Sequence, residues 1–203
     1  MSRQMSDDDE GKMLQIAMPG RDPLTLRHLV LDLNGTLAVD GHVVDGVAAR
    51  LDALRAHLQL HVLTAGTHGH MDECAMVLGL RPLAIGTGTE KRDHVRTLGP
   101  EQVVALGNGA NDVLMLREAA LAIAVLGPEG LCADALAAAD VVVADPCAGL
   151  DLLLHRRAWS PRCAHEGQSD RPLPRRREPD GTHPAGLQHH RERAPRPRVR
   201  ALP

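Results

Sequence analysis

Short apolar runs alternate with longer amphipathic stretches from about residue 45 to residue 154. The apolar runs are continuous, which is typical of strands that are buried on both faces. The amphipathic stretches repeat their apolar positions at helical spacing, as Val47, Leu51, Leu54 and Leu58 do within residues 45–58. The pattern predicts strands at residues 60–64, 82–85, 103–106, 121–126 and 141–144, and helices at residues 45–58, 69–78, 90–98, 111–120, 129–139 and 147–154.

Two strand-like runs precede this region. LQIAMP (14–19) and LTLRHLVLDL (24–33) flank the turn-forming residues GRDP. An apolar run on each side of a Gly/Asp/Pro turn predicts a β-hairpin, here leading into a long strand that ends near Asp32.

Buried strands that alternate with helices indicate a parallel sheet covered on both faces. We therefore expect a doubly wound, Rossmann-like α/β domain from about residue 13 to residue 156, preceded by the β-hairpin. In this class of fold, ligands bind at the carboxyl ends of the strands, where the strand order reverses.

The two ends of the chain have a different character. Residues 1–12 are polar and rich in Asp, which predicts a disordered leader. Residues 157–203 hold 8 of the 14 prolines and many arginines, and their composition predicts a disordered tail. Two alternatives for the tail stay open: out-of-frame translation of GC-rich DNA, or a tether to RNA or a membrane.

Composition and charge exclude several classes of function. The chain has no Phe or Tyr and one Trp, so it lacks the stacking platforms of single-strand nucleic-acid binders. Residues 1–155 carry a net charge of −10 and residues 156–203 carry +7, so nucleic acid is an unlikely partner for the body.

The chain also carries no signal that would send it out of the cytoplasm. The four cysteines show no C-x-x-C spacing, and no apolar run reaches the 18 residues of a membrane span. An acidic N-terminus is unlike a signal peptide. We expect a cytoplasmic protein with no membrane partner.

Four groups of polar residues follow the predicted strands in order. Asp32 ends the first long strand and is followed by Asn34-Gly35-Thr36, and Thr64 ends the next strand in LTAG. Lys91 opens a helix, and the segment GNGAND places Asn108 and Asp112 just after a strand.

Each group has a simpler structural interpretation. Asp32 with the Asn-Gly pair could be a common turn, Thr64 a buried hydroxyl, and Lys91 a solvated helix residue. GNGAND could be a glycine-rich turn, or the Gly-x-Gly of a dinucleotide site, which normally sits in the first strand-to-helix turn. A further alternative is a soft-metal site formed by His68, His70 and Cys74.

The four groups in this order resemble the motifs of the haloacid-dehalogenase (HAD) superfamily of hydrolases. DLNGTLAVDG, LTAGT and GNGANDVLMLREAALAIAVLG are most similar to the soluble P-type-ATPase-like members that lack a cap domain, over about residues 13–155. The resemblance implies a phosphatase or phosphotransferase in which Asp32 accepts the phosphoryl group as an aspartyl-phosphate.

The same resemblance implies roles for the other residues. Mg²⁺ would be held by Asp32, Asn34 through its main-chain carbonyl, Asn108 and Asp112. The phosphoryl oxygens would be bound by Thr64, by the main-chain N–H groups of Ala65 and Gly66, and by Lys91.

Two residues depart from the superfamily pattern. Asn34 stands where its phosphatases usually have an Asp that acts as general acid and base, and such help is typically worth about 10²–10⁴-fold in rate. Asn108 stands where a magnesium-binding Asp is usual, which leaves Asp112 as the acidic residue of that loop. We expect slow turnover. The alternatives are a degenerate module that binds a phosphorylated ligand or partner without turnover, and an interaction protein that acts through the tail.

The spacing of the motifs leaves no room for an inserted cap domain. Thr64 follows Asp32 by 32 residues and Lys91 follows Thr64 by 27 residues. A capless site is open, so we expect either a homo-oligomeric partner that covers it or a large substrate such as a phosphoprotein, with a phosphorylated small molecule as the other substrate class.

Overall fold

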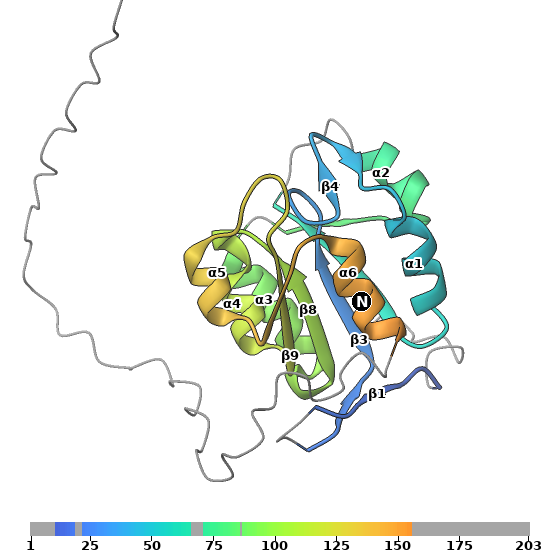
Figure 1. Cartoon of the computed structure of the whole chain (residues 1–203), viewed down its shortest axis with the longest axis vertical. Coiled ribbons are helices and arrows are strands. Elements are labelled where there is room, and N and C mark those ends of the chain that lie inside the picture. Colours follow the sequence, from blue (N-terminus) through green and yellow to red (C-terminus); the bar gives the residue numbers. More distant parts are fainter. Residues whose placement is uncertain (1–10, 19–21, 66–70, 86, 156–203) are drawn as a thin grey trace, which may run out of the picture. The chain divides into compact units, whose positions relative to one another are not determined.

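The computed structural model describes residues 11–18, 22–65, 71–85 and 87–155 (Figure 1). The chain divides into two units, residues 1–167 and residues 168–203, and every described residue belongs to the first. Residues 1–10 of the predicted leader, all of the predicted tail and the soft-metal candidates His68 and His70 lie outside the described residues. Among the described residues, no helix is long and apolar enough to cross a membrane.

Six strands form one parallel sheet in the order β10-β9-β8-β3-β6-β7. Two smaller antiparallel hairpins accompany it, β1–β2 and β4–β5. The strands are β1 (Leu14–Ile16), β2 (Leu24–Leu26), β3 (His28–Asp32), β4 (Ala38–Val39), β5 (His42–Val43), β6 (Gln59–Thr64), β7 (Leu83–Ala84), β8 (Val103–Gly107), β9 (Leu121–Val125) and β10 (Val141–Val143). The helices are α1 (Val47–Leu54), α2 (Met71–Leu78), α3 (Gly88–Leu98), α4 (Val113–Glu118), α5 (Ala133–Ala138) and α6 (Pro146–Leu154).

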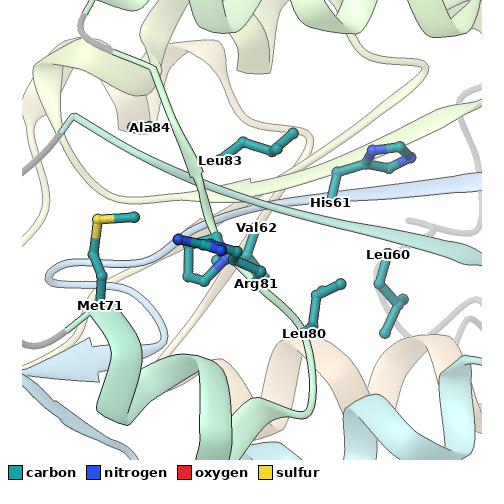
Figure 2. Close-up of a pocket in the computed structure, with 9 residues that line it drawn as sticks. Leu60, His61, Val62, Met71, Leu80, Arg81, Leu83 and Ala84 are labelled. Atoms are coloured by element: carbon teal, nitrogen blue, oxygen red, sulfur yellow. The ribbon is translucent and has the colours of Figure 1, made fainter. Parts of the chain in front are cut away.

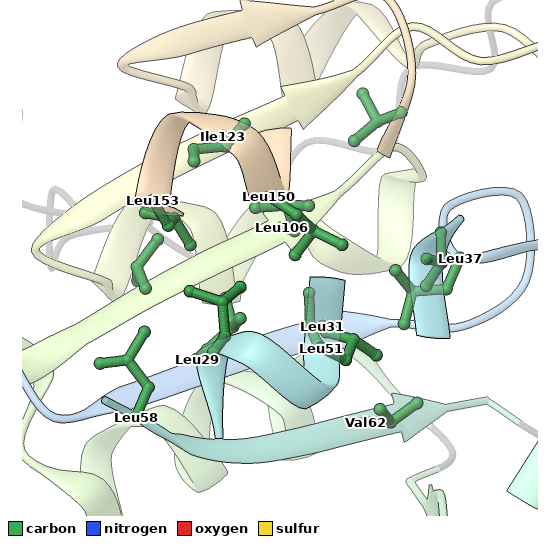
Figure 3. Close-up of a cluster of buried hydrophobic side chains, with 14 of the residues drawn as sticks. Leu29, Leu31, Leu37, Leu51, Leu58, Val62, Leu106, Ile123, Leu150 and Leu153 are labelled. Atoms are coloured by element: carbon green, nitrogen blue, oxygen red, sulfur yellow. The ribbon is translucent and has the colours of Figure 1, made fainter. Parts of the chain in front are cut away.

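The sheet is covered on both faces, as the continuous apolar strands predicted. Along β3, Leu29 and Leu31 belong to one buried cluster and Val30 to the other, because successive side chains of a strand point to opposite faces. The first cluster includes residues of α1, α2, α6 and the β1–β2 hairpin, and the second includes residues of α3, α4 and α5. Figure 3 shows the first cluster, with Leu51 and Leu150 against the strands.

The strand order reverses at β3. From β3 the chain passes through α1 to β6 and through α2 to β7, and it then returns through α3 to β8 on the opposite side of β3. The carboxyl ends of β3 and β8 therefore diverge into connections on opposite faces. This is the position at which doubly wound folds bind ligands.

The predicted α/β class, parallel sheet and N-terminal hairpin are confirmed. The β4–β5 hairpin was not predicted, because strands of two residues carry no detectable periodicity. The predicted helix at residues 129–139 was wrong in its first turn, since α5 begins only at Ala133 and residues 127–132 form a loop. Gly127 and Gly130 in this loop have φ angles of 51° and 89°, which a helix does not contain.

Leu150 of α6 provides a test of the first core cluster. Its side chain is fully buried, so Leu150→Ala should lower the free energy of unfolding by about 2–5 kcal/mol through lost burial and a residual cavity. The matched control is Leu136→Ala in α5, where the side chain is 49% exposed and the expected loss is well below that of Leu150→Ala. Urea titration followed by far-UV circular dichroism measures both, and equal losses would contradict the packing described here.

Three histidine side chains that lie side by side on β3, β6 and α3 predict that the fold is sensitive to acid. Nε2 of His61 on β6 lies 3.4 Å from Nδ1 of His28 on β3, and Nε2 of His94 on α3 lies 3.3 Å from Nδ1 of His61. Burial lowers the pKa of His94 below its ordinary value of 6.5. The unfolded chain therefore binds more protons than the folded chain just below pH 6.5, so this contribution to stability is complete above that pH and declines as the pH falls through it.

The expected result is a smaller decrease in unfolding free energy between pH 7.5 and pH 5.5 for His94→Asn than for the wild type. Urea titrations at a series of pH values measure it. His57→Asn is the control because His57 is exposed and stands apart from the row. A slope for His94→Asn that equals the wild-type slope would refute the contribution of His94.

Candidate active site

The buried polar side chains of the described residues gather at one place. Among the described residues, the polar or charged side chains that are buried are Asp32, Thr36, Thr64, Lys91, Asn108 and Asp112, each at most 8% exposed. They come from the ends of β3, β6 and β8, from the first turn of α3 and from the 3₁₀ turn Ala110–Asp112. Five of the six were predicted from the sequence as site residues. Burying polar groups costs free energy unless they are paired, so this concentration makes the strand ends the candidate functional site.

Lys91 joins two of the strand ends by ion pairs. Its ammonium Nζ donates to Oδ1 of Asp32 at 2.5 Å and to Oδ1 of Asp112 at 2.7 Å. The side chains of Lys91 and Asp112 are fully buried, and that of Asp32 is 4% exposed. Buried ion pairs of this kind keep a defined geometry, because separating the partners would leave a buried charge without compensation, which costs free energy.

The start of α3 fixes the position of Lys91. The Thr87 hydroxyl accepts a hydrogen bond from the Glu90 main-chain N–H at 3.2 Å, and the Glu90 carboxylate accepts one from the Thr87 N–H at 2.8 Å. This reciprocal pair is a capping box, which sets the first residue of the helix. Lys91 lies in that first turn, and Val95 one turn later is buried in the second core cluster on the same helix face.

Asp112 shapes the loop after β8. Its Oδ2 accepts from the main-chain N–H groups of Asn108 at 3.0 Å and Gly109 at 2.9 Å, while its Oδ1 accepts from Lys91. Gly107 lies so close that a β-carbon there would stand 2.7 Å from the Asp112 carboxyl group. Both oxygens of Asp112 are therefore engaged in holding the loop and Lys91.

Thr36 links the carboxylate of Asp32 to the amide of Asn108. The Thr36 hydroxyl lies 3.1 Å from Oδ2 of Asp32 and 3.2 Å from Oδ1 of Asn108, so its single hydrogen can serve either acceptor. Sequence analysis had placed Thr36 in the motif without giving it a role. Three oxygens thus lie together at the end of β3, and one of them belongs to the residue expected to accept the phosphoryl group.

Asn34 is an exposed member of the site and is hydrogen-bonded to Thr64. Its side chain is exposed, and its Nδ2 donates to Oγ1 of Thr64 at 3.1 Å. Gly35 follows with a φ of 78°. This conformation strains residues that have a β-carbon, so glycine allows the chain to turn directly after Asn34. Ala65 lies just beyond Thr64 and is exposed, whereas Gly66 lies outside the described residues.

The electrostatics of the site leave one negative charge in excess. The pKa of Asp32 is raised to about 6, because burial and, to a smaller extent, the charge of Asp112 outweigh the opposing effects of Lys91 and Thr36. Burial by itself lowers the pKa of Lys91, but the charges and hydrogen bonds of Asp32 and Asp112 outweigh it and raise this pKa above its ordinary value. Two carboxylates thus share one ammonium, and a further cation would stabilise the ionised site.

The residues present fit Mg²⁺ as that cation. Mg²⁺ prefers oxygen ligands, commonly one or two carboxylates with waters and substrate phosphate. Oδ2 of Asp32 and Oδ1 of Asn108 are close enough to share the Thr36 hydroxyl, and the donor set contains no soft ligand. No group of three or more His, Cys, Asp or Glu side chains that could hold a metal occurs in the described part of the chain, so the amide of Asn108 would have to contribute.

A hollow between β6, β7 and α2 is separate from this site. It has a volume of about 610 Å³ and is lined largely by apolar residues such as Val62, Met71 and Leu83, with Arg81 also in the lining (Figure 2). None of the six buried polar residues lines it. Cys74, a member of the soft-metal candidate, belongs to the first core cluster instead.

Comparison with known proteins places the fold. No family model matches the chain. Two uncharacterized proteins of Methanocaldococcus jannaschii, MJ0073 and MJ0072, are each 44% identical to it, over 55 and 39 residues. The matched segments cover 27% and 19% of this chain, and they span 59% of the first protein and 89% of the second.

Solved structures of phosphatases share the fold at low sequence identity. The 3-deoxy-D-manno-octulosonate 8-phosphate phosphatase of Moraxella catarrhalis has a TM-score of 0.54 at 19% identity and covers 64% of this chain and 87% of its own. The Vibrio cholerae protein described as a putative enzyme of the same kind has a TM-score of 0.54 at 15% identity, and the match covers 71% of this chain and 97% of that protein. A putative HAD family hydrolase of Streptomyces avermitilis has a TM-score of 0.51 at 20% identity, and the match covers 66% of this chain and 84% of that protein. The chain therefore belongs to the same family as the second Methanocaldococcus protein, and it has the fold of the haloacid-dehalogenase superfamily that its motifs predicted.

Proposed function

We propose that this protein is a HAD-type, Mg²⁺-dependent phosphatase or phosphotransferase in which Asp32 accepts the phosphoryl group. The observation that carries the proposal is the convergence of the buried polar side chains on Asp32, at the strand end where the order of the sheet reverses. Such a concentration of buried charge around one carboxylate is typical of a catalytic centre.

The proposed reaction has two steps. In the first, an oxygen of Asp32 forms a bond to phosphorus while the bond from phosphorus to the leaving oxygen breaks. In the second, water attacks phosphorus, the bond to Asp32 breaks, and inorganic phosphate is released; in a phosphotransferase an acceptor hydroxyl takes the place of the water. Mg²⁺, when bound, would offset the repulsion between the carboxylate and the phosphoryl oxygens.

The residues around Asp32 have distinct tasks in this proposal. Lys91 holds Oδ1 of Asp32 and provides positive charge, and Asp112 keeps Lys91 in place. The Thr64 hydroxyl accepts a hydrogen bond from the Asn34 side chain, and in this proposal it binds a phosphoryl oxygen. The N–H groups of Ala65 and Gly66 would complete that cradle. Asp32, the Asn34 carbonyl and Asn108 would hold the metal, with Asp112 in a supporting position.

Slow turnover follows from Asn34. An amide cannot donate a proton to the leaving oxygen or remove one from the attacking water, so both protons would have to come from or go to solvent. The substrate would be a phosphorylated small molecule or a phosphoprotein. Between the end of β3 and the start of β6 the chain forms only the β4–β5 hairpin and α1, which supports an open site that a large substrate or a second copy of the chain could cover. A cytoplasmic location remains part of this proposal.

A second candidate function is phospholigand binding without turnover. It is favoured by the two asparagines, because Asn34 removes the acid–base group and Asn108 removes a negative charge from the metal site. Both candidates require the phosphoryl site, and only the enzyme requires Asp32 to be phosphorylated.

Asp32→Asn tests the nucleophile. We expect hydrolysis of p-nitrophenyl phosphate and acetyl phosphate with Mg²⁺ to fall by about 10³-fold or more, because an amide cannot form the acyl-phosphate. The phosphorylated intermediate, detected by intact-mass analysis after acid quenching, should disappear as well. The control is Asp40→Asn on the exposed β4–β5 turn, which should keep wild-type activity. Activity that survives in Asp32→Asn would remove Asp32 from its role, and a wild type without activity or intermediate would favour the binding module.

Asn34→Asp tests the missing acid. The new carboxylate should raise the rate constant for turnover by up to about 10²-fold, which is the lower limit of the usual range for general acid–base catalysis. Asn34→Ala is the matched control: it also removes the hydrogen bond to Thr64, but it adds no titratable group and should give no increase. Steady-state kinetics with a substrate whose leaving group is a poor one, such as phenyl phosphate, measures the effect. An Asn34→Asp variant that is no faster than the wild type would refute this account.

A further inference from the structure

The loop after β9 is attached to the site by Asn108. The Asn108 carbonyl accepts from the Cys132 N–H at 2.9 Å, and the Asn108 side chain donates through Nδ2 to the Gly130 carbonyl at 3.3 Å. These bonds attach to residues 130 and 132, within the part of the predicted helix, residues 129–132, that forms a loop instead. A carboxylate at position 108 could not donate to Gly130 and would lose the second bond.

This attachment brings Glu129 to the turn that follows Asp32. A β-carbon at Gly35 would lie 2.8 Å from Oε2 of Glu129, 2.8 Å from Nδ2 of Asn108 and 3.2 Å from Oδ1 of Asn108. The Glu129 carboxylate therefore stands against Gly35, beside the Asn108 amide. The loop approaches the same turn a second time, since a β-carbon at Gly127 would lie 3.3 Å from the Gly35 carbonyl oxygen.

The charge of Glu129 complements the composition of the site. Among the inner carboxylates, Asp32 is the better placed for a metal, because its Oδ2 shares the Thr36 hydroxyl with Asn108, whereas both oxygens of Asp112 hold the loop and Lys91. The Asn108 amide contributes an oxygen but no charge. Glu129 is exposed, so its carboxylate keeps its freedom to reach a ligand or an ordered water at the opening of the site.

We propose that Glu129 supplies the second negative charge of the magnesium site, acting from the loop that Asn108 holds in place. Asn108 would then provide the oxygen ligand and Glu129 the negative charge that a single Asp at position 108 would provide together. Glu129 is a positioning residue for metal-bound water rather than a group that touches phosphorus, because a carboxylate next to the phosphoryl oxygens would repel them unless a cation lay between. The inference rests on the proposed function, since it requires a metal at Asp32.

Metal affinity measured without substrate is the readout. The full chain is titrated with Mg²⁺ in a calorimeter, and with Mn²⁺ by electron paramagnetic resonance. Glu129→Gln should raise the dissociation constant about tenfold, the low end of the effect of groups that support a metal site from outside its ligands. The matched control is Asp134→Asn, which removes the same charge from the exposed start of α5 and should bind both metals like the wild type.

A double-mutant cycle separates replacement of charge from other effects. Asn108→Asp in the Glu129→Gln background should restore at least part of the lost affinity, because it returns a carboxylate to the site. In the wild-type background, Asn108→Asp should change affinity by less than it does in Glu129→Gln.

The outcomes distinguish this inference from the function on which it rests. Equal affinities for Glu129→Gln and the wild type, or equal losses in Glu129→Gln and Asp134→Asn, would overturn the role of Glu129 and leave Asp32 untouched. A wild type that binds no Mg²⁺, or an Asp32→Asn variant that binds it as well as the wild type does, would overturn the metal site itself. Urea titration of each variant without metal provides the check on folding, where Glu129→Gln should match the wild type.

Discussion

The whole site depends on one buried ammonium held between two carboxylates. Lys91 pairs with Asp32 at the end of β3 and with Asp112 in the loop after β8, so it connects segments that the sheet places next to each other but the sequence separates by 80 residues. In a medium of low dielectric constant, none of these charges is tolerated without the others. The capping box of α3, the turn at Gly35 and the hydrogen bonds of Asp112 all serve to keep this arrangement in place.

The same arrangement explains why a cation suits the site. Two carboxylates share one ammonium, and burial raises the pKa of Asp32 to about 6. A bound divalent cation would favour the ionised Asp32 that the proposed chemistry requires. In the proposed reaction the two asparagines would act in different ways. Asn34 would leave the reaction without a proton donor, whereas Asn108 would give up a charge, and its amide donates a hydrogen bond to Gly130 in the neighbouring loop. A protein of this kind would be expected to hold a phosphoryl group better than it releases one.

Much of the site was accessible from the sequence because parallel strands bring their carboxyl ends to one edge. Asp32, Thr64 and Asn108 each follow a continuous apolar run, and any parallel sheet built from those runs collects them. No role was predicted for Thr36, because its bond to Asn108 joins the segment after β3 to the segment after β8. Glu129 was not predicted as a site residue, because residues 129–139 were predicted to form a helix. The bonds from Asn108 to Gly130 and Cys132 that prevent a helix there come from another segment of the chain.

The sequence by itself determined the α/β class, the order of strands and helices along the chain, and the identity of the polar residues at the strand ends. These features are local: they follow from apolar periodicity, from glycine and proline at turns, and from which residue ends each strand. Only the tertiary structure decided that Asp112 binds Lys91 and its own loop, that Thr36 stands between Asp32 and Asn108, and that Glu129 lies against Gly35. The contacts of Lys91 with Asp112, of Thr36 with Asn108 and of Glu129 with Gly35 join residues distant in sequence, so their geometry depends on the pairing of β3 with β8.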